Sequence, residues 1–81
     1  MIQNEKKQVL LEVVQKAKKL IGETLSKRFV DMIENSDSES SLFLAGKAIK
    51  TQIKRGRRVQ NKEFAEGLLG ILQDMLLEML K

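Results

Sequence analysis

At 81 residues, the chain is long enough for a single domain spanning residues 1–81. It contains neither Cys nor His, which excludes disulfides, thiolate chemistry, and the commonest general base and metal ligand. The composition, 42% hydrophobic and 32% charged with no Pro, predicts a folded all-α protein. No apolar signal region or apolar run of membrane-spanning length is present, so a cytoplasmic protein without a transmembrane segment is expected.

Residues 4–34 have helical periodicity, and Gly22 in the middle leaves two interpretations open. Apolar stripes flank the glycine, formed by Leu10, Val13, Val14, Ala17, Leu20 and Ile21 before it, and by Phe29, Val30, Met32 and Ile33 after it. In one interpretation Gly22 ends a first helix in a left-handed conformation, and Thr24 or Ser26 caps a second. In the other, one long helix passes through the glycine. A long helix would overhang its neighbours and need a partner chain, so both monomer and homodimer are open.

The clearest boundary is Asn35–Glu39, where Ser36 and Glu39 have the spacing of a capping box. A helix is expected from there to about Arg55, with an apolar stripe of Leu42, Ala45, Ile49 and Ile53, and with Leu44 and Ala48 beside it. Gly56 fits the C′ position of this helix, and Asn61 fits the N-cap of the next. The sequence therefore predicts a small antiparallel bundle of four helices if the chain breaks at Gly22, and otherwise one long helix with two shorter ones.

The last helix, expected over residues 62–81, has the widest apolar stripe and is predicted to lie at the centre of the bundle. The stripe consists of Phe64, Ala65, Leu68, Leu69, Ile71, Leu72, Met75, Leu76, Met79 and Leu80. Gly67 and Gly70 lie on the opposite face, where they are tolerated on an exposed surface or let another backbone approach closely. Leu77 shares that face, either as an ordinary surface leucine or as part of an oligomer contact.

Positive charge is concentrated in one stretch of the chain. Between Ser40 and Lys62 there is no acidic residue, whereas the basic residues are Lys47, Lys50, Lys54, Arg55, Arg57, Arg58 and Lys62. The first three of these share one helix face with Phe43, which either packs under a neighbouring helix end or is an exposed anchor for a partner. Three interpretations compete for this surface: a solvated face, a site for an acidic protein or anionic membrane surface, and a nucleic-acid site.

Two features count against nucleic acid. The chain has no Trp or Tyr to stack on bases, and the acidic residues of the last helix would repel a duplex.

The carboxylate pairs Glu63/Glu66 and Asp74/Glu78 are typical of solvated helix surfaces, and only this helix is rich in carboxylates. Catalysis, a metal and a cofactor are therefore not expected.

The order of these stripes resembles the class IIa bacteriocin immunity proteins, of the enterocin A immunity type. The likeness lies in Leu10–Val14 of the first helix, in Ser41–Ile49 before a basic turn, and in Phe64–Leu72 of the last helix. The chain departs from that family in having neither Tyr nor Trp. The resemblance implies a non-catalytic protein that protects its producer at the inner membrane face through contacts with a receptor–bacteriocin complex. The alternatives are a small basic nucleic-acid-binding or regulatory protein of phage or plasmid type, and a structural subunit of a helical assembly.

Overall fold

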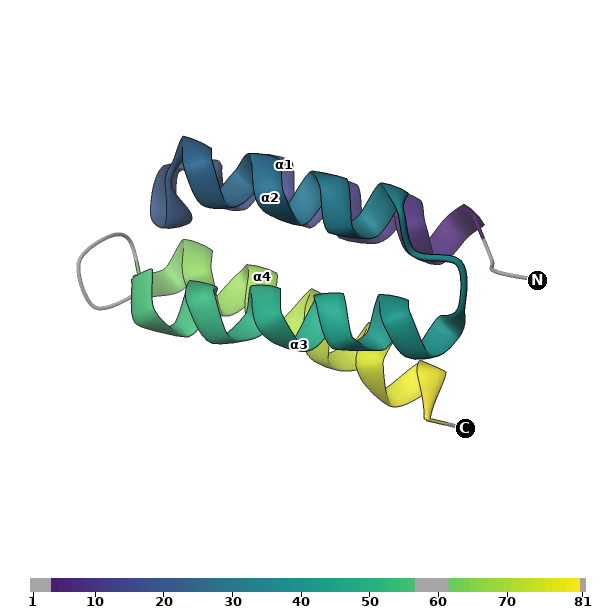
Figure 1. The fold of residues 1–81 in the computed structure, drawn as a ribbon. Helices are drawn as coiled ribbons and strands as arrows, with labels where there is room; N and C mark the ends of the chain where they lie inside the picture. The colour runs from purple at the N-terminus through teal and green to yellow at the C-terminus, as the bar shows by residue number, and fades with distance from the viewer. Residues whose placement is uncertain (1–3, 57–61, 81) are drawn as a thin grey trace.

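The computed structural model describes residues 4–56 and 62–80, which form four α-helices. These are α1 (Asn4–Ile21), α2 (Glu23–Glu34), α3 (Glu39–Gly56) and α4 (Lys62–Met79). Successive helices run in opposite directions, with α1 and α2 forming one layer and α3 and α4 the other (Figure 1). The described residues contain no strand. The predicted all-α antiparallel bundle is confirmed, in its four-helix form.

Gly22 alone separates α1 from α2. Its N–H donates to the carbonyl of Lys18 at 2.8 Å, and its own carbonyl accepts from the N–H of Ser26 at 3.1 Å. Its backbone angles, φ 89° and ψ 163°, lie in a region that only glycine adopts readily. The predicted break is therefore correct, but a cap at Thr24 or Ser26 is wrong, because α2 begins directly after the glycine. With two helices in place of one, the overhang that would have needed a partner chain does not arise.

The N-terminus of α3 is capped by Ser38, not by Ser36. The Ser38 Oγ accepts from the N–H of Ser41 at 3.1 Å, and the Ser38 carbonyl accepts from the N–H of Leu42. Ser36 is buried, and its hydroxyl donates to the carbonyl of Met32 at 2.7 Å, at the end of α2. The capping serine therefore lies two residues later than predicted. Ser36 and Ser38 each have a polar residue three positions later, so the spacing alone fitted both.

Gly56 is the last residue of α3, and its role differs from the predicted C′ position. Gly22 is the only described residue with positive φ. A Cβ at Gly56 would lie 2.9 Å from the carbonyl oxygen of Leu20. Glycine is needed here because the end of α3 packs directly on the backbone at the end of α1. The prediction that Asn61 caps α4 falls outside the described residues.

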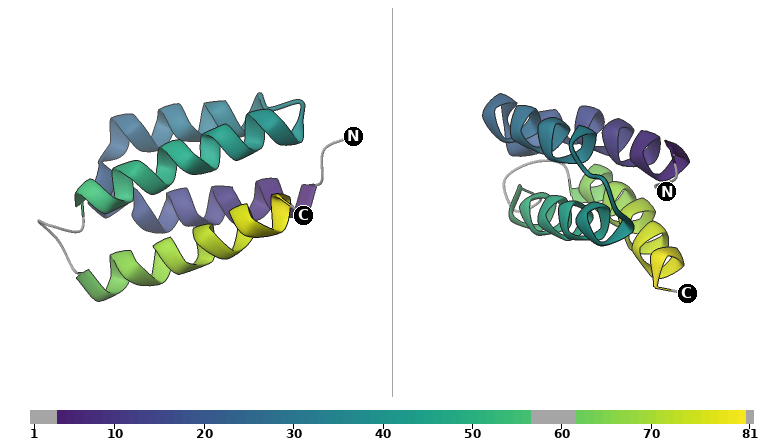
Figure 2. Two further views of the ribbon diagram at one scale, coloured as in Figure 1. Left: turned by 90° about the horizontal axis from the view of Figure 1, so that it is seen from below. Right: turned by 45° about the vertical axis from the view of Figure 1, so that its right-hand side comes forward.

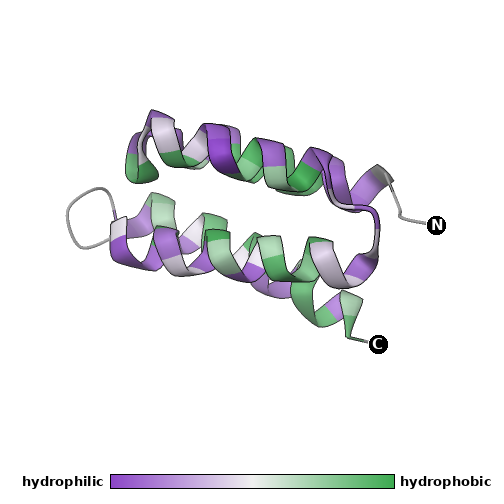
Figure 3. Ribbon diagram, viewed as in Figure 1, coloured by the Kyte–Doolittle hydropathy of each residue, from purple (hydrophilic) through white to green (hydrophobic). Residues whose placement is uncertain are grey.

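The hydrophobic core lies between the two layers, where the apolar faces of the four helices meet (Figure 3). Its buried members are Leu10, Val13, Val14, Ala17, Phe29, Ile33, Leu42, Ala45, Ile49, Ile53, Ala65, Leu68, Leu72 and Met75. Viewed from the side of the α3/α4 layer, α1 lies behind the space between α3 and α4 (Figure 2). This arrangement buries the predicted stripe of α3, whereas Leu20 and Ile21 at the end of the α1 stripe are partly buried and Leu44 beside the α3 stripe is exposed.

The expectation that α4 is central is wrong. Both α1 and α3 contact all three other helices, whereas α4 contacts only these two and, over the described residues, does not reach α2. Three members of its predicted stripe are consequently exposed, with Phe64 at 39%, Ile71 at 44% and Leu80 at 68%. A helix that packs against only two other helices buries a face that is narrower than the apolar stripe in its sequence.

Candidate functional site

The predicted basic residues separate into two groups. Lys47 and Lys50 lie along the side of α3, whereas Lys54 and Arg55 are in its last turn and Lys62 begins α4. Arg57 and Arg58 lie outside the described residues. Because α3 ends where α4 begins, the second group belongs to one end of the bundle (Figure 1). The single surface expected from the sequence is therefore a side and an end, with different surroundings.

The lysines on the side of α3 have partners within the bundle. The Lys47 ammonium lies 5.8 Å from the centre of the Phe43 ring, within the range of a cation–π interaction. Lys50 is partly buried and donates a hydrogen bond to Oε1 of Gln73, which joins α3 to α4. Phe43 itself is partly buried beside Leu44, Met79 and Leu80, in a shallow cavity where α3 meets the end of α4. This position agrees with packing under a neighbouring helix end.

The end of the bundle gathers further basic residues that sequence analysis did not assign to the site. Lys18 and Lys19 are in the last turn of α1, which reaches the same end as the last turn of α3. We define the basic end by five exposed residues, Lys18, Lys19, Lys54, Arg55 and Lys62. The signal for the two missed lysines was the break at Gly22, because in an up-and-down bundle the first and third helices end on the same side.

The electrostatics of the basic end follow from helix direction and from a small number of acidic neighbours. The C-termini of α1 and α3 carry the negative ends of their helix dipoles, which stabilise Lys and Arg in the last turn. Glu23 forms an ion pair with Lys18 at 3.3 Å, but these side chains are 82% and 44% exposed. Such a surface pair contributes little. At the same end of the bundle, the first turn of α4 contributes a further acidic residue, Glu63, so the basic residues of the basic end outnumber these acidic ones.

The opposite end of the bundle has acidic residues and some basic partners. Glu39, in the first turn of α3, forms an ion pair with Lys6 at 3.2 Å. Lys7 donates to the backbone carbonyl of Glu34 at 3.3 Å, at the end of α2. Asp37 lies between these helices and is exposed. The charge of the chain is thus distributed unevenly along the axis of the bundle.

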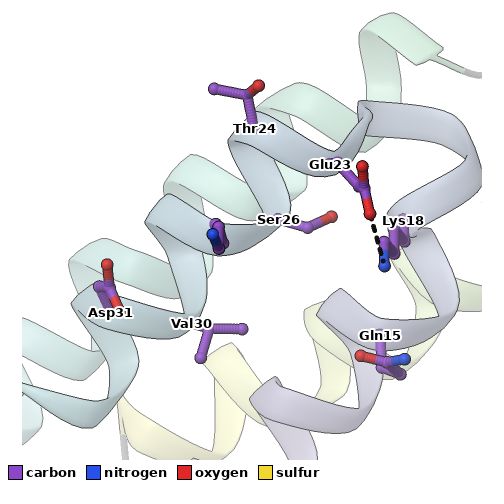
Figure 4. A pocket seen from close by; sticks show the side chains of 8 residues that line it. Gln15, Lys18, Glu23, Thr24, Ser26, Val30 and Asp31 are labelled. Carbon is purple, nitrogen blue, oxygen red and sulfur yellow. Dashed lines mark ion pairs between the residues drawn. The ribbon is translucent and has the colours of Figure 1, made fainter.

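A groove between α1 and α2 contains a buried hydroxyl. Ser26 is 6% exposed, and its Oγ has no hydrogen-bond partner among the described residues. Its side chain points toward the part of the groove where Lys18 lies, beside the ion pair with Glu23 (Figure 4). The rest of the lining mixes charges and neutral groups: Gln15, Thr24, Lys27, Val30 and Asp31. Nothing in this mixture selects one class of ligand.

Residues 4–56 and 62–80 contain no group of three or more acidic side chains placed to hold a metal ion. None of the helices in this part of the chain is long and apolar enough to cross a membrane. No protein-family model, curated protein sequence or solved structure matches the chain.

Proposed function

We propose that the chain is a non-enzymatic binding protein whose basic end contacts an acidic surface of a protein partner. The observation that carries the proposal is the gathering of exposed basic side chains from three helices at one end of the bundle. Helix ends hold the backbone of these residues in place, so the charge pattern exists before a partner arrives. Such a pattern accelerates association with an oppositely charged surface and selects against like-charged ones.

Three features favour a protein partner over a nucleic acid. Lys50 is partly buried and bonds to Gln73, which interrupts the row of lysines on α3 that a phosphate backbone could follow. The exposed face of α4 next to the basic end carries Glu63 and Glu66, which would repel the second strand of a duplex. The chain also lacks Trp and Tyr, the side chains that most often stack on single-stranded bases.

Within this class, we propose an immunity-type protein that acts at the inner membrane face. Its support is the resemblance in helix order, together with a four-helix bundle in which the third helix ends in basic residues. The partner would be a receptor–bacteriocin complex, and the basic end would meet its acidic cytoplasmic surface. The lack of His and Cys agrees with a role that requires binding but no chemistry.

A protection assay tests this proposal. The chain is expressed in a bacterium that is sensitive to class IIa bacteriocins, and the bacteriocin concentration needed to stop growth is measured. The proposal predicts a higher concentration for cells that express the chain. The triple substitution Lys54→Glu, Arg55→Glu and Lys62→Glu should remove this protection, because it reverses the charge of the basic end.

A matched control separates a local effect from a change in net charge. Lys16, Lys27 and Arg28 are exposed on α1 and α2 and are not among the five residues that define the basic end, and their change to Glu alters net charge equally. This control should protect as well as the unaltered chain, with equal expression and helical content. No protection by the unaltered chain against any bacteriocin of the class would contradict the immunity assignment. Equal loss in both triple variants would contradict the role of the basic end.

A further inference from the structure

The α3/α4 layer has an outer face that is turned away from α1 and α2 (Figure 2). Helical spacing places two columns of exposed side chains on this face. The column on α3 consists of Leu44, Lys47, Thr51 and Lys54, and the column on α4 consists of Glu66, Gly70, Asp74 and Leu77. Both have the three- and four-residue spacing of one helix face. One column is therefore basic with a leucine at one end, and the other is acidic with a leucine at one end.

The two leucines are unusually open for their size. Leu44 is 64% exposed and Leu77 is 50% exposed. A single surface leucine is common and needs no explanation. Here, however, Leu80, at 68% exposure, and the partly buried Phe43 lie at the same end of the layer, so the apolar surface is shared by neighbouring helices. A cluster of this kind, next to charged columns, has the composition of a contact surface.

Two contacts show which residues of the two columns are level with one another, that is, lie at the same height along the axis of the bundle. A Cβ at Gly46 would meet Leu76, and Lys50 bonds to Gln73. Counting along the antiparallel helices from these contacts gives four level pairs, which are Leu44 with Leu77, Lys47 with Asp74, Thr51 with Gly70, and Lys54 with Glu66. Each pair matches to within three residues, about 4.5 Å along the axis.

We propose that this face binds a second copy of the chain about a twofold axis parallel to the helices. This axis places α3 of one copy over α4 of the other, and it leaves the level of every residue unchanged. Leu44 then packs on the partner copy's leucine of α4, while Lys47 and Lys54 meet the partner copy's acidic residues. An isologous contact of this kind forms every pair twice.

Charge complementarity selects this axis. An axis in the same plane but perpendicular to the helices would place α3 on α3 and α4 on α4, which brings like charges together. Within the described parts of the chain, Lys54, Glu66 and Asp74 have no ion-pair partner, so they are available to another molecule. Nothing lies within 4 Å of a Cβ built on Gly70, and that open position is where Thr51 of the other copy crosses. A glycine at the crossing lets the two helices approach closely.

The experiment is a charge exchange followed by sedimentation equilibrium. One variant carries Lys47→Glu and Lys54→Glu, and the other carries Glu66→Lys and Asp74→Lys. The unaltered chain should dimerise, with weaker association at higher salt. Each variant alone should be monomeric, because both contact zones then bring like charges together. An exposed ion pair contributes a factor of about two to five, so four lost pairs raise the dissociation constant on the order of 100-fold.

Mixing the two variants should restore a dimer, because each zone of the mixed pair again joins opposite charges. The control carries Lys16→Glu and Lys27→Glu on the α1/α2 layer, which changes net charge as much as the α3 variant and should leave dimerisation intact. Circular dichroism of each variant checks that the helices are retained. A monomeric unaltered chain would overturn the inference, as would dimers in either single variant or a mixture of folded variants that stays monomeric. None of these outcomes requires the partner of the basic end. Because Lys54 belongs to both surfaces, the Glu66→Lys, Asp74→Lys variant tests dimerisation without altering the basic end.

Discussion

Leu72→Ala tests the packing of the bundle at its best-defined point. Leu72 has no exposed surface and belongs to the core cluster with Leu10 and Ile49. The substitution removes three carbons, worth about 2.4 kcal/mol at about 0.8 kcal/mol each. The cavity left behind brings the expected loss of unfolding free energy to about 2–5 kcal/mol. For a domain of this size, each kcal/mol lowers the melting temperature by roughly 4–8 °C.

The matched control is the next residue in the chain. Ile71 is 44% exposed, and Ile71→Ala also improves helix propensity, so its unfolding free energy should change by less than about 1 kcal/mol. Urea unfolding followed by circular dichroism measures both variants, at a low protein concentration that keeps association out of the measurement. A loss below about 0.5 kcal/mol for Leu72→Ala, or equal losses for the two variants, would refute the orientation of α4.

Three glycine substitutions test the backbone of the bundle by the same unfolding measurement. Gly22→Ala should destabilise by about 1–3 kcal/mol, because alanine resists the positive φ at the α1–α2 junction; an unchanged midpoint would contradict that geometry. Gly56→Ala should cost about 1–3 kcal/mol, because its Cβ would press on the Leu20 carbonyl, and a stabilised variant would show that the two helix ends are not in contact. Gly67→Ala should stabilise by up to about 1 kcal/mol, because the added Cβ projects into open space; a loss of stability would contradict its exposure.

Local features of the chain allowed its elements to be predicted from sequence. The absence of Pro and the helical spacing of apolar residues were sufficient for an all-α bundle and for the stripes of α1 and α3, but they left open whether the chain breaks at Gly22. These features were not sufficient to identify Ser38 as the cap of α3, because the preference for a serine before a helix does not distinguish Ser38 from the nearby Ser36. The close contact of Gly56 with Leu20 depends on tertiary packing, which helix propensity does not contain.

The wide apolar stripe of α4 led to the wrong prediction that this helix is central, and the reason is related. Periodicity shows which residues share a face, but the number of neighbouring helices decides how much of that face is buried. Phe64 and Ile71 lie at the edge of the stripe toward which no further helix packs. The basic residues were likewise identified correctly as charges, but their division into a side and an end required the direction of each helix. Lys18 and Lys19 join the basic end only through that topology.

The proposed dimer has a consequence for the proposed function. Because its twofold axis is parallel to the helices, the basic ends of the two copies point the same way. The dimer would thus present two basic ends to one partner surface. Association of the chain and recognition of its partner would then use different residues, apart from Lys54.

The claim that the basic end is a protein-binding surface is tested most directly by a titration with nucleic acids. Duplex DNA, single-stranded DNA and RNA are each titrated with the chain at two salt concentrations, alongside the Lys54→Glu, Arg55→Glu, Lys62→Glu variant. The account predicts weak binding that the variant and the unaltered chain share. Tight binding with a logarithmic salt slope near −0.9 per phosphate contact on duplex DNA, lost in the variant, would contradict it and assign the basic end to nucleic acid.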